Sequence, residues 1–264
     1  MNIIVLIKQV PDTTEVKVDN KTGNLIRKGI PTIINPYDIH ALEEGLRLKE
    51  KFGGSVTAVS MGPPQTIDAL QEAVSMGIDT CILLTDEAFA GADTLATAYT
   101  LGKSIEKIGK FDIIICGYQA IDGDTAQVGP QVAEYLDIPQ ITCARNIKVN
   151  GNKLVAERVI EDGYEKIECG LPALITVVKE INKPRYPTID KIMYACGKEA
   201  DIKIWNAGDI GAMADKTGLS GSPTNVKQVF TPEQKKKCEM LTGTHDSIAM
   251  QLLDRLRGKK LIKN

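Results

Sequence analysis

The sequence predicts an α/β fold: a mostly parallel sheet with helices on both faces, an antiparallel hairpin extension and an extended C-terminal arm. Two observations support it. Continuous apolar runs alternate with helix-like patterns through the first half of the chain, which is the order that right-handed crossovers between parallel strands require. After residue 140 the pattern changes to alternating polar and apolar positions with Asn-Gly and Asp-Gly turns, which is typical of antiparallel hairpins.

Four apolar runs in the first half are predicted to be buried strands. The first, "IIVLIKQV", is almost continuously apolar, as expected for a parallel strand that is covered on both faces. Ligands of such sheets bind beyond the carboxyl ends of the strands, so the glycine-rich turns after the second and fourth runs are of most interest. The four runs are 3–10, 55–62, 80–85 and 111–117.

Four segments with apolar residues three or four positions apart are predicted to be helices. In the first, Asp38 is a candidate N-cap and Gly53-Gly54 ends the pattern. Asp93 or Thr94 is expected to cap the third, and Thr125 is a candidate cap for the fourth. The four segments are 34–54, 64–77, 91–109 and 125–137.

The second half is predicted to hold an antiparallel ribbon and then an arm. The ribbon covers 141–180 and attaches to the parallel sheet. Residues 1–190 are therefore expected to form one α/β domain. Residues 191–264 contain proline, glycine and polar residues with only brief apolar runs, so they are expected to be an arm that packs on another surface. A final helix over 244–257 is predicted, with Thr244 as its cap.

Composition excludes several function classes. The formal net charge is -2, so nothing favours nucleic-acid binding, which needs clustered cations. The basic run Lys235-Lys236-Lys237 is expected to be a solvated face. The first residues lack a positively charged segment before their apolar run, and no apolar run reaches the ~18–20 residues that a membrane span needs.

The cysteines and histidines predict neither disulfides nor a metal site. The six cysteines are scattered without a CxxC pair, and the chain has only His40 and His245. Reduced thiols in the core of a cytoplasmic protein are therefore expected. The cysteines are Cys81, Cys116, Cys143, Cys169, Cys196 and Cys238.

The stretch "GYQAIDGDTAQVGPQ" at 117–131 is the candidate anion site. A helix N-terminus offers unpaired N–H groups and a partial positive charge, and Gly123 gives the backbone room to turn. Two alternatives stay open from the residues alone: a phosphate cradle, or merely a tight strand-to-helix turn. The P-loop and GxGxxG spacings are absent. Asp122 and Asp124 would repel a phosphate unless they point away or bind ribose hydroxyls.

Six motifs in order resemble the beta subunit of electron transfer flavoprotein. They are "VLIKQVPD", "NPYDIHALEEGLRLKE", "VTAVSMGPPQ", "DTLATA", "GYQAIDGDTAQVGPQVAEYL" and "KPRYPTIDKI". The resemblance spans residues 1–195 and continues more weakly to the end. It implies a Rossmann-like adenine-nucleotide-binding domain that forms a heterodimer with an alpha subunit, onto which the C-terminal arm wraps.

The resemblance also assigns the nucleotide site. The phosphate-binding loop falls on Asp122 to Gly129, with adenine and ribose contacts in the strand ends before it. For Leu6 and Met61, an ordinary role in the strand core remains the alternative. The residues so assigned are Leu6, Asn35, Met61, Gly117, Asp122, Gly123, Asp124, Thr125, Ala126, Gln127, Val128 and Gly129.

The family has two branches, one holding AMP as a structural ligand and one holding a second FAD that performs electron bifurcation. "DEAFAGADTLATAY" at 86–99 resembles the FAD branch. Gly91 and Ala92 would leave space for the ring system, and Thr94 and Thr97 would hydrogen-bond it. Asp93 belongs to the same loop, although Asp93 and Thr94 could merely cap the helix. Tyr118 departs from the pattern, since many relatives carry Lys or Arg there.

The implied function is that of a bifurcating beta subunit. NADH would deliver a hydride to its FAD, one electron would pass to ferredoxin or flavodoxin, and the other would pass through the alpha-subunit FAD to a flavin-dependent dehydrogenase. No side chain is expected to act as acid, base or nucleophile. The alternatives are a non-bifurcating subunit with AMP, or an unrelated ATP-binding module. The motif SGGxDS of ATP pyrophosphatases is absent, which argues against an unrelated ATP-binding module.

"KPRYPTIDKI" resembles the family's loop that docks onto the partner dehydrogenase. The docking residues would be Pro184, Arg185, Tyr186 and Ile189, with Ile189 as the apolar anchor. The alternative is that Ile189 packs within its own chain.

Overall fold

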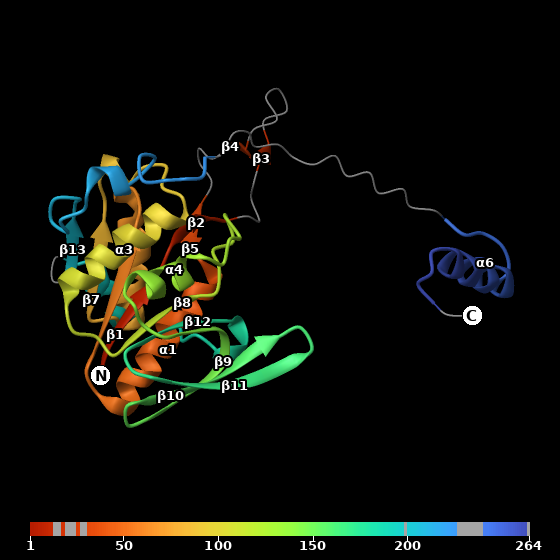
Figure 1. Cartoon of the computed structure of the whole chain (residues 1–264), viewed down its shortest axis with the longest axis horizontal. Coiled ribbons are helices and arrows are strands. Elements are labelled where there is room, and N and C mark those ends of the chain that lie inside the picture. The colour runs from red at the N-terminus through yellow and green to blue at the C-terminus, as the bar shows by residue number, and fades with distance from the viewer. Residues whose placement is uncertain (13–16, 19–24, 27–30, 198–199, 226–239, 263–264) are drawn as a thin grey trace. The chain divides into compact units, whose positions relative to one another are not determined.

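The computed structural model describes residues 1–12, 17–18, 25–26, 31–197, 200–225 and 240–262. The described strands form one nine-stranded sheet, in the order β11-β10-β9-β12-β8-β1-β6-β7-β13 (Figure 1). Two short antiparallel pairs lie outside it: β2 (Gln9–Pro11) with β5 (Thr32–Ile34), and β3 (Lys17–Val18) with β4 (Leu25–Ile26). The mixed α/β class expected from the sequence is confirmed.

Six adjacent strands, from β12 to the edge strand β13, are all parallel. They are β12 (Ala173–Val177), β8 (Ile113–Gly117), β1 (Asn2–Leu6), β6 (Ser55–Met61), β7 (Thr80–Leu84) and β13 (Ile202–Trp205). From β1 the chain proceeds to β6 and β7 on one side, and then returns to place β8 on the other side. The crevice between β1 and β8 is therefore the switch point at which open α/β sheets bind ligands.

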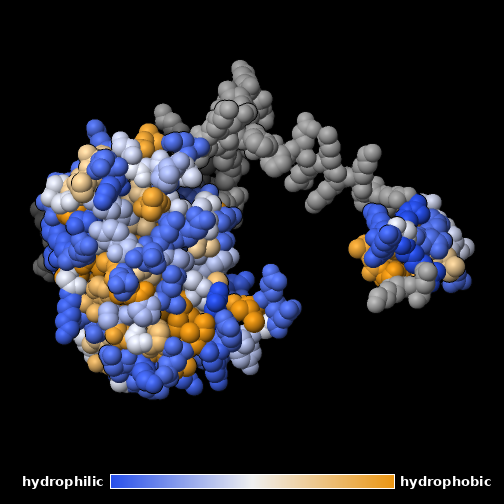
Figure 2. Space-filling view, viewed as in Figure 1, coloured by the Kyte–Doolittle hydropathy of each residue, from blue (hydrophilic) through white to orange (hydrophobic). Residues whose placement is uncertain are grey.

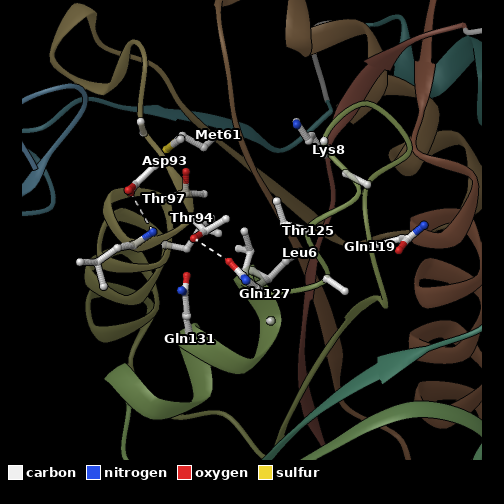
Figure 3. A pocket seen from close by; sticks show the side chains of 18 of the residues that line it. Leu6, Lys8, Met61, Asp93, Thr94, Thr97, Gln119, Thr125, Gln127 and Gln131 are labelled. Atoms are coloured by element: carbon white, nitrogen blue, oxygen red, sulfur yellow. Dashed lines mark hydrogen bonds between the residues drawn. The ribbon is translucent and has the colours of Figure 1, made fainter. Parts of the chain in front are cut away.

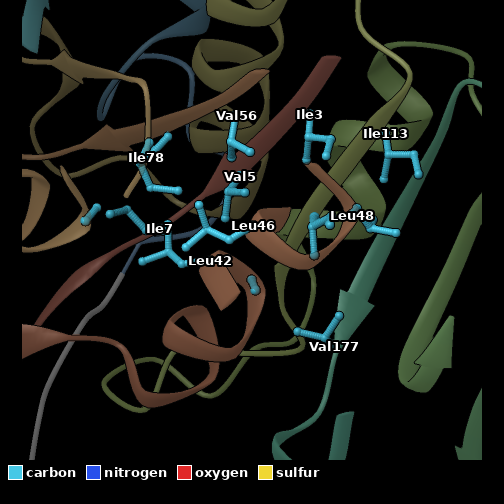
Figure 4. Packing of buried hydrophobic residues seen from close by; sticks show 14 of the residues in the cluster. Ile3, Val5, Ile7, Leu42, Leu46, Leu48, Val56, Ile78, Ile113 and Val177 are labelled. Carbon is cyan, nitrogen blue, oxygen red and sulfur yellow. The ribbon is translucent and has the colours of Figure 1, made fainter. Parts of the chain in front are cut away.

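Helices cover both faces of the sheet, and each face has its own apolar core. The side chains of Ile3 and Val5 pack in a core with α1 (Pro36–Phe52) and α2 (Ile67–Met76) (Figure 4). Those of Ile4 and Leu6 pack in a second core with α3 (Thr94–Ile108) and α4 (Val128–Tyr135). This two-sided burial explains why the central strands are apolar at consecutive positions. Single turns of 3₁₀ helix occur at η2 (Pro64–Thr66), η3 (Glu87–Phe89), η4 (Lys179–Ile181) and η5 (Ala214–Lys216).

The first predicted strand is shorter than expected. The run 3–10 divides into β1, which ends at Leu6, and β2, which leaves the main sheet to pair with β5. At the break, the backbone N–H of Lys8 donates to the Asp38 carboxylate at 2.8 Å instead of to a neighbouring strand. The apolar character continues through the break because Val10 is buried as well.

The predicted ribbon is confirmed for its first three strands. β9 (Gln140–Asn150), β10 (Lys153–Ile160) and β11 (Gly163–Gly170) are antiparallel, with turns at the Asn-Gly and Asp-Gly pairs. The expectation was wrong for the last segment. Strand β12 pairs in parallel with β8 and β9, and its five residues are all buried. It is thus an inner strand of the main sheet.

The chain divides into two compact units, 1–228 and 229–264. The first extends beyond residue 190, because α5 (Ile189–Ala195) packs on α2 and β13 forms an edge of the main sheet. In the second, α6 (His245–Gly258) begins where predicted, with the Thr244 side chain accepting from the Ser247 N–H. Figure 2 shows exposed apolar residues on this second unit, and Met250 and Leu261 are among them. The run Lys235-Lys236-Lys237 and Cys238 lie outside the described residues.

Candidate functional site

A cavity of about 1020 Å³ opens at the carboxyl ends of the parallel strands. Leu6 at the end of β1 and Met61 at the end of β6 contribute to its wall (Figure 3). Gly117 at the end of β8 lines it as well. The N-termini of α3 and α4 also border it. The cavity thus occupies the switch point of the sheet, at the upper end of the ~300–1,000 Å³ typical of small-molecule sites.

Most of the residues that the sequence singled out line this one cavity. Asp122 is the exception among the nucleotide-site residues, since it lies in the loop but not in the cavity wall. Leu6 is buried in the second core and lines the cavity at the same time. The lining residues that were expected are Leu6, Asn35, Met61, Gly91, Ala92, Asp93, Thr94, Thr97, Gly117, Gly123, Asp124, Thr125, Ala126, Gln127, Val128 and Gly129.

The loop before α4 presents backbone N–H groups. Asp124 and Ala126 adopt left-handed conformations with φ of 49° and 54°, and Gln127 follows in the right-handed region. Such alternation turns successive N–H groups toward one side and makes an anion-binding concavity. Within the described residues, the N–H groups of 125–129 have no protein acceptor. They are therefore free for a ligand.

One detail of the expected loop was wrong. Thr125 does not cap the helix, because the N-cap residue is Gln127 and makes no side-chain cap. Gly123 lies in a turn, where its N–H donates to the carbonyl of Ala120 at 3.3 Å, but the positive φ values fall on Asp124 and Ala126. The glycine that is needed is Gly129. A Cβ there would lie 2.8 Å from the Cγ2 of Thr176, so glycine lets α4 approach β12.

Both aspartates of the loop are paired with neighbours. The Nζ of Lys8 lies 2.7 Å from both carboxylate oxygens of Asp122, and the Gln119 amide donates to Asp124 at 2.9 Å. Their charges are thus partly compensated within the loop, which removes much of the objection that they would repel a phosphate. The geometry gives them a structural role.

Asn35 and Asp38 tie the loop to the sheet. The Asn35 amide donates to the carbonyl of Gln119 at 2.9 Å and accepts from the N–H of Ile121 at 3.2 Å. Asp38 accepts from the N–H of Lys8 at 2.8 Å and from that of Gly117 at 3.0 Å. Asn35 was expected to contact the nucleotide. It lines the cavity, but its amide holds the loop.

Asp38 has a second property that its position explains. Its side chain is buried between β1 and β8, and this burial raises the pKa of its carboxyl to about 7, although Asn35 and the two N–H donors act in the opposite direction. Asp38 is a helix residue and was expected to cap its own helix. It instead bridges the ends of the two strands that form the switch point.

The N-terminus of α3 is capped by Asp93, whose carboxylate accepts from the N–H groups of Leu95 and Ala96 at 3.0 Å each. Burial opposes ionisation, but hydrogen bonds from Thr224 and from the helix hold the pKa of Asp93 below its usual range. The Thr94 hydroxyl donates to the Gln127 amide at 3.3 Å (Figure 3). The two helix N-termini therefore meet at the cavity.

The two N-termini differ in what they can bind. The first N–H groups of α3 are satisfied by a carboxylate, whereas those before α4 are free. A phosphate therefore fits at α4, and an uncharged ring system fits at α3. The buried Oε1 of Gln131, one turn into α4, has no hydrogen-bond partner among the described residues. A buried acceptor in the wall of a cavity is available to a hydrogen-bond donor that enters it.

Several lining residues were not anticipated. Lys8 and Gln119 pair with the loop aspartates, and residues 219 and 223–225 reach the cavity from far along the chain. The sequence around residues 219 and 223–225 did not reveal this position, because a local pattern does not encode contacts between distant parts of the chain. Tyr118 also lines the cavity, and its ring packs edge-on against that of Tyr37 with 4.6 Å between the centroids.

The segment 183–192 places its residues in two groups. Arg185 is held by α1: its Nε donates to the Glu43 carboxylate at 2.8 Å, and its Nη1 pairs with Glu50. Tyr186 and Ile189 are 91% and 76% exposed, so Ile189 is not packed among the described residues of the first unit. Pro184 is half-buried beside them.

Among the described residues, no helix is long and apolar enough to cross a membrane. No group of three or more His, Cys, Asp or Glu side chains is arranged to hold a metal ion in the same residues. The five described cysteines are free thiols.

Comparison with known proteins identifies the family. The pattern of the electron transfer flavoprotein domain matches residues 22–208. The chain is 53% identical to "Electron transfer flavoprotein subunit beta" of Thermoanaerobacterium thermosaccharolyticum, with 99% of this chain and 100% of the relative aligned. It is 48% identical to "Caffeyl-CoA reductase-Etf complex subunit CarD" of Acetobacterium woodii, and 43% identical to "Acryloyl-CoA reductase electron transfer subunit gamma" of Anaerotignum propionicum. In both of these, 99% of this chain and 100% of the relative are aligned. The chain belongs to the electron transfer flavoprotein family, and is a beta subunit.

Proposed function

We propose that this beta subunit is of the bifurcating type and holds an FAD in the cavity at the switch point. The observation that carries the proposal is that one continuous cavity contains both a free anion-binding loop and a helix N-terminus already neutralised by Asp93. A mononucleotide would use the first and leave the second empty. A dinucleotide uses both.

The proposed roles follow from the chemistry of each wall. The N–H groups of 125–128 bind the phosphates, and Gly129 lets the helix behind them approach the sheet. Thr94 and Thr97 border the region in which the ring system would lie. Bound FAD would supply hydride acceptance from NADH and single-electron transfer. The protein residues bind and orient it, and none of them needs to transfer a proton.

The partners are proposed from exposed surfaces and from relatives. An alpha subunit would cover the exposed apolar side chains of α6, such as Met250 and Leu252. Its own FAD would pass one electron to a flavin-dependent dehydrogenase, while ferredoxin or flavodoxin takes the other. Two relatives are named for caffeyl-CoA and acryloyl-CoA reductases, which supports a dehydrogenase of the acyl-CoA class. Tyr186 and Ile189 would dock it. The free thiols support a cytoplasmic location.

The test is co-expression with the neighbouring alpha-subunit reading frame, followed by extraction of the bound nucleotides and an anaerobic NADH titration. We expect two FAD per heterodimer, one of which is bleached by NADH. One FAD together with AMP, and no bleaching, would show instead that the chain is a non-bifurcating subunit. A colourless complex that binds ATP would contradict both readings.

A further inference from the structure

Residues 217–225, called the strap here, form part of the cavity wall. They contact Asp93, although they lie more than 120 positions further along the chain. Leu219, Pro223, Thr224 and Asn225 line the cavity. Two other side chains of the strap, those of Thr217 and Ser222, are buried. The strap is thus the wall of the cavity that comes from outside the βα units.

Asp93 joins the strap to the N-terminus of α3. One carboxylate oxygen, Oδ1, caps α3, and the other, Oδ2, accepts from the N–H of Thr224 at 3.0 Å and from its hydroxyl at 2.7 Å. The N–H of Asp93 donates to the hydroxyl of Ser222 at 2.8 Å, which in turn donates to the carbonyl of Gly218 at 2.6 Å. Asp93 therefore caps the helix and holds the strap at the same time.

Close packing accompanies these hydrogen bonds. A Cβ at Gly91, where φ is 72°, would lie 2.7 Å from the Cγ of Leu219. A Cβ at Gly218, where φ is 52°, would lie 2.3 Å from the carbonyl oxygen of Ala88. Both positions require glycine, for conformation as well as for space. The loop before α3 and the strap therefore pack closely at Gly91 and at Gly218 as well as at Asp93.

An ionised carboxylate has about four acceptor sites, and Asp93 accepts four hydrogen bonds from the protein. It has little capacity left for a ligand, although it was expected to bind the cofactor directly. We propose that Asp93 is a positioning residue: it latches the strap over the cavity, so that closure of the latch and occupation of the cavity by the nucleotide stabilise each other. This inference rests on the proposed function in that the nucleotide is taken to be FAD.

The coupling follows from linkage. A ligand that contacts Leu219, Thr224 or Asn225 in the closed arrangement binds that arrangement more tightly than an open one, and so favours closure by the same factor. Loss of the latch must then weaken the binding of the ligand, and removal of the ligand must make the strap more mobile. A residue that only capped α3 would give neither effect on the strap.

The experiment compares Asp93→Asn and Thr224→Val with the wild type in the complex with the alpha subunit. The matched control is Asp86→Asn. Asp86 accepts from the N–H of Ala88 and from that of Ala207, each at 3.0 Å, so it also joins a cap to a distant segment, but it does not line the cavity. Two quantities are measured: the rate of FAD release from this subunit, and hydrogen exchange over 217–225 with and without FAD.

We expect both latch variants to release FAD about tenfold faster, the equivalent of one lost hydrogen bond, and to lose the protection that FAD gives to the strap. The double variant should release FAD at most about twice as fast as either single variant, because both substitutions break the same latch. Asp86→Asn should match the wild type. Faster release in Asp93→Asn but not in Thr224→Val would overturn the latch, as would strap exchange that does not respond to FAD. If the wild type holds AMP instead of FAD, the proposed function fails, and the same comparison with AMP still decides the latch.

Discussion

Replacing Asp38 by asparagine tests the electrostatics of the switch point. The carboxyl is buried, accepts from the N–H groups of Lys8 and Gly117, and has its pKa raised to about 7. In the unfolded chain the pKa of this carboxyl returns to its ordinary value of 3.8. Between these two values the folded protein holds a proton that the unfolded chain has lost. The contribution of Asp38 to the free energy of unfolding therefore falls as the pH rises.

The magnitude follows from the two pKa values. From pH 5.5 to pH 8, linkage gives a fall of about 2 kcal/mol in the free energy of unfolding of the wild type relative to Asp38→Asn. At ~2–4 °C for each kcal/mol in a chain of this size, the difference in Tm should change by about 4–8 °C. Other groups with raised pKa values, such as Glu44 and Glu72, titrate in both proteins and cancel in the difference.

The assay is urea or thermal unfolding of nucleotide-stripped wild type and Asp38→Asn at several pH values. The stripped protein is needed because Asp38 lines the cavity. A difference in stability that does not change with pH would refute the reasoning. A difference that changes in the opposite sense would show that the two N–H donors, and not burial, dominate the carboxyl.

Three further results are expected. Gly129→Ala should lose about 1–3 kcal/mol of stability by overpacking, because its Cβ would contact Thr176; Gly123→Ala, whose Cβ meets nothing within 4 Å, is the control in denaturant titrations and should match the wild type. Cys196 is exposed, whereas Cys116 is buried with its thiol pKa raised by that burial; mass spectrometry after a short iodoacetamide pulse should find the first alkylated and the second intact until the protein unfolds. Arg185→Lys keeps the charge but loses the paired hydrogen bonds to the carboxylates of α1; hydrogen exchange over 183–188 should rise while flavin content stays constant, and unchanged exchange would mean that the loop is held by other contacts.

The parallel sheet could be predicted because burial on both faces leaves a direct mark on the sequence. Each central strand is apolar at consecutive positions, and the helices between strands have apolar residues on one face. The hairpins were visible through Asn-Gly and Asp-Gly turns, which few other structures favour. Strand β12 was misassigned because a short apolar run after a hairpin looks the same whether it pairs in parallel or antiparallel fashion.

The candidate site could be predicted only in part. In its local portion, the start of α3 was visible because Asp93 is a typical cap residue, and the loop at 122–129 was visible as a glycine-containing strand-to-helix turn, although the expected cap Thr125 is not used. Its long-range portion was invisible. The bond from Gly117 to Asp38 spans 79 positions, and that from Thr224 to Asp93 spans 131. No local pattern encodes such pairs, and polar residues that meet this way resemble ordinary surface residues until the fold brings them together.

We propose that the cavity holds a dinucleotide. The most direct measurement is calorimetric titration of FAD and of AMP into nucleotide-stripped protein in complex with the alpha subunit, with the alpha-subunit site kept filled. We predict that FAD binds at one site on this chain at least tenfold more tightly than AMP, because its phosphates bind the free N–H groups before α4 while its ring system fills the part of the cavity beside α3. AMP binding as tightly as FAD, or tighter, would contradict the claim.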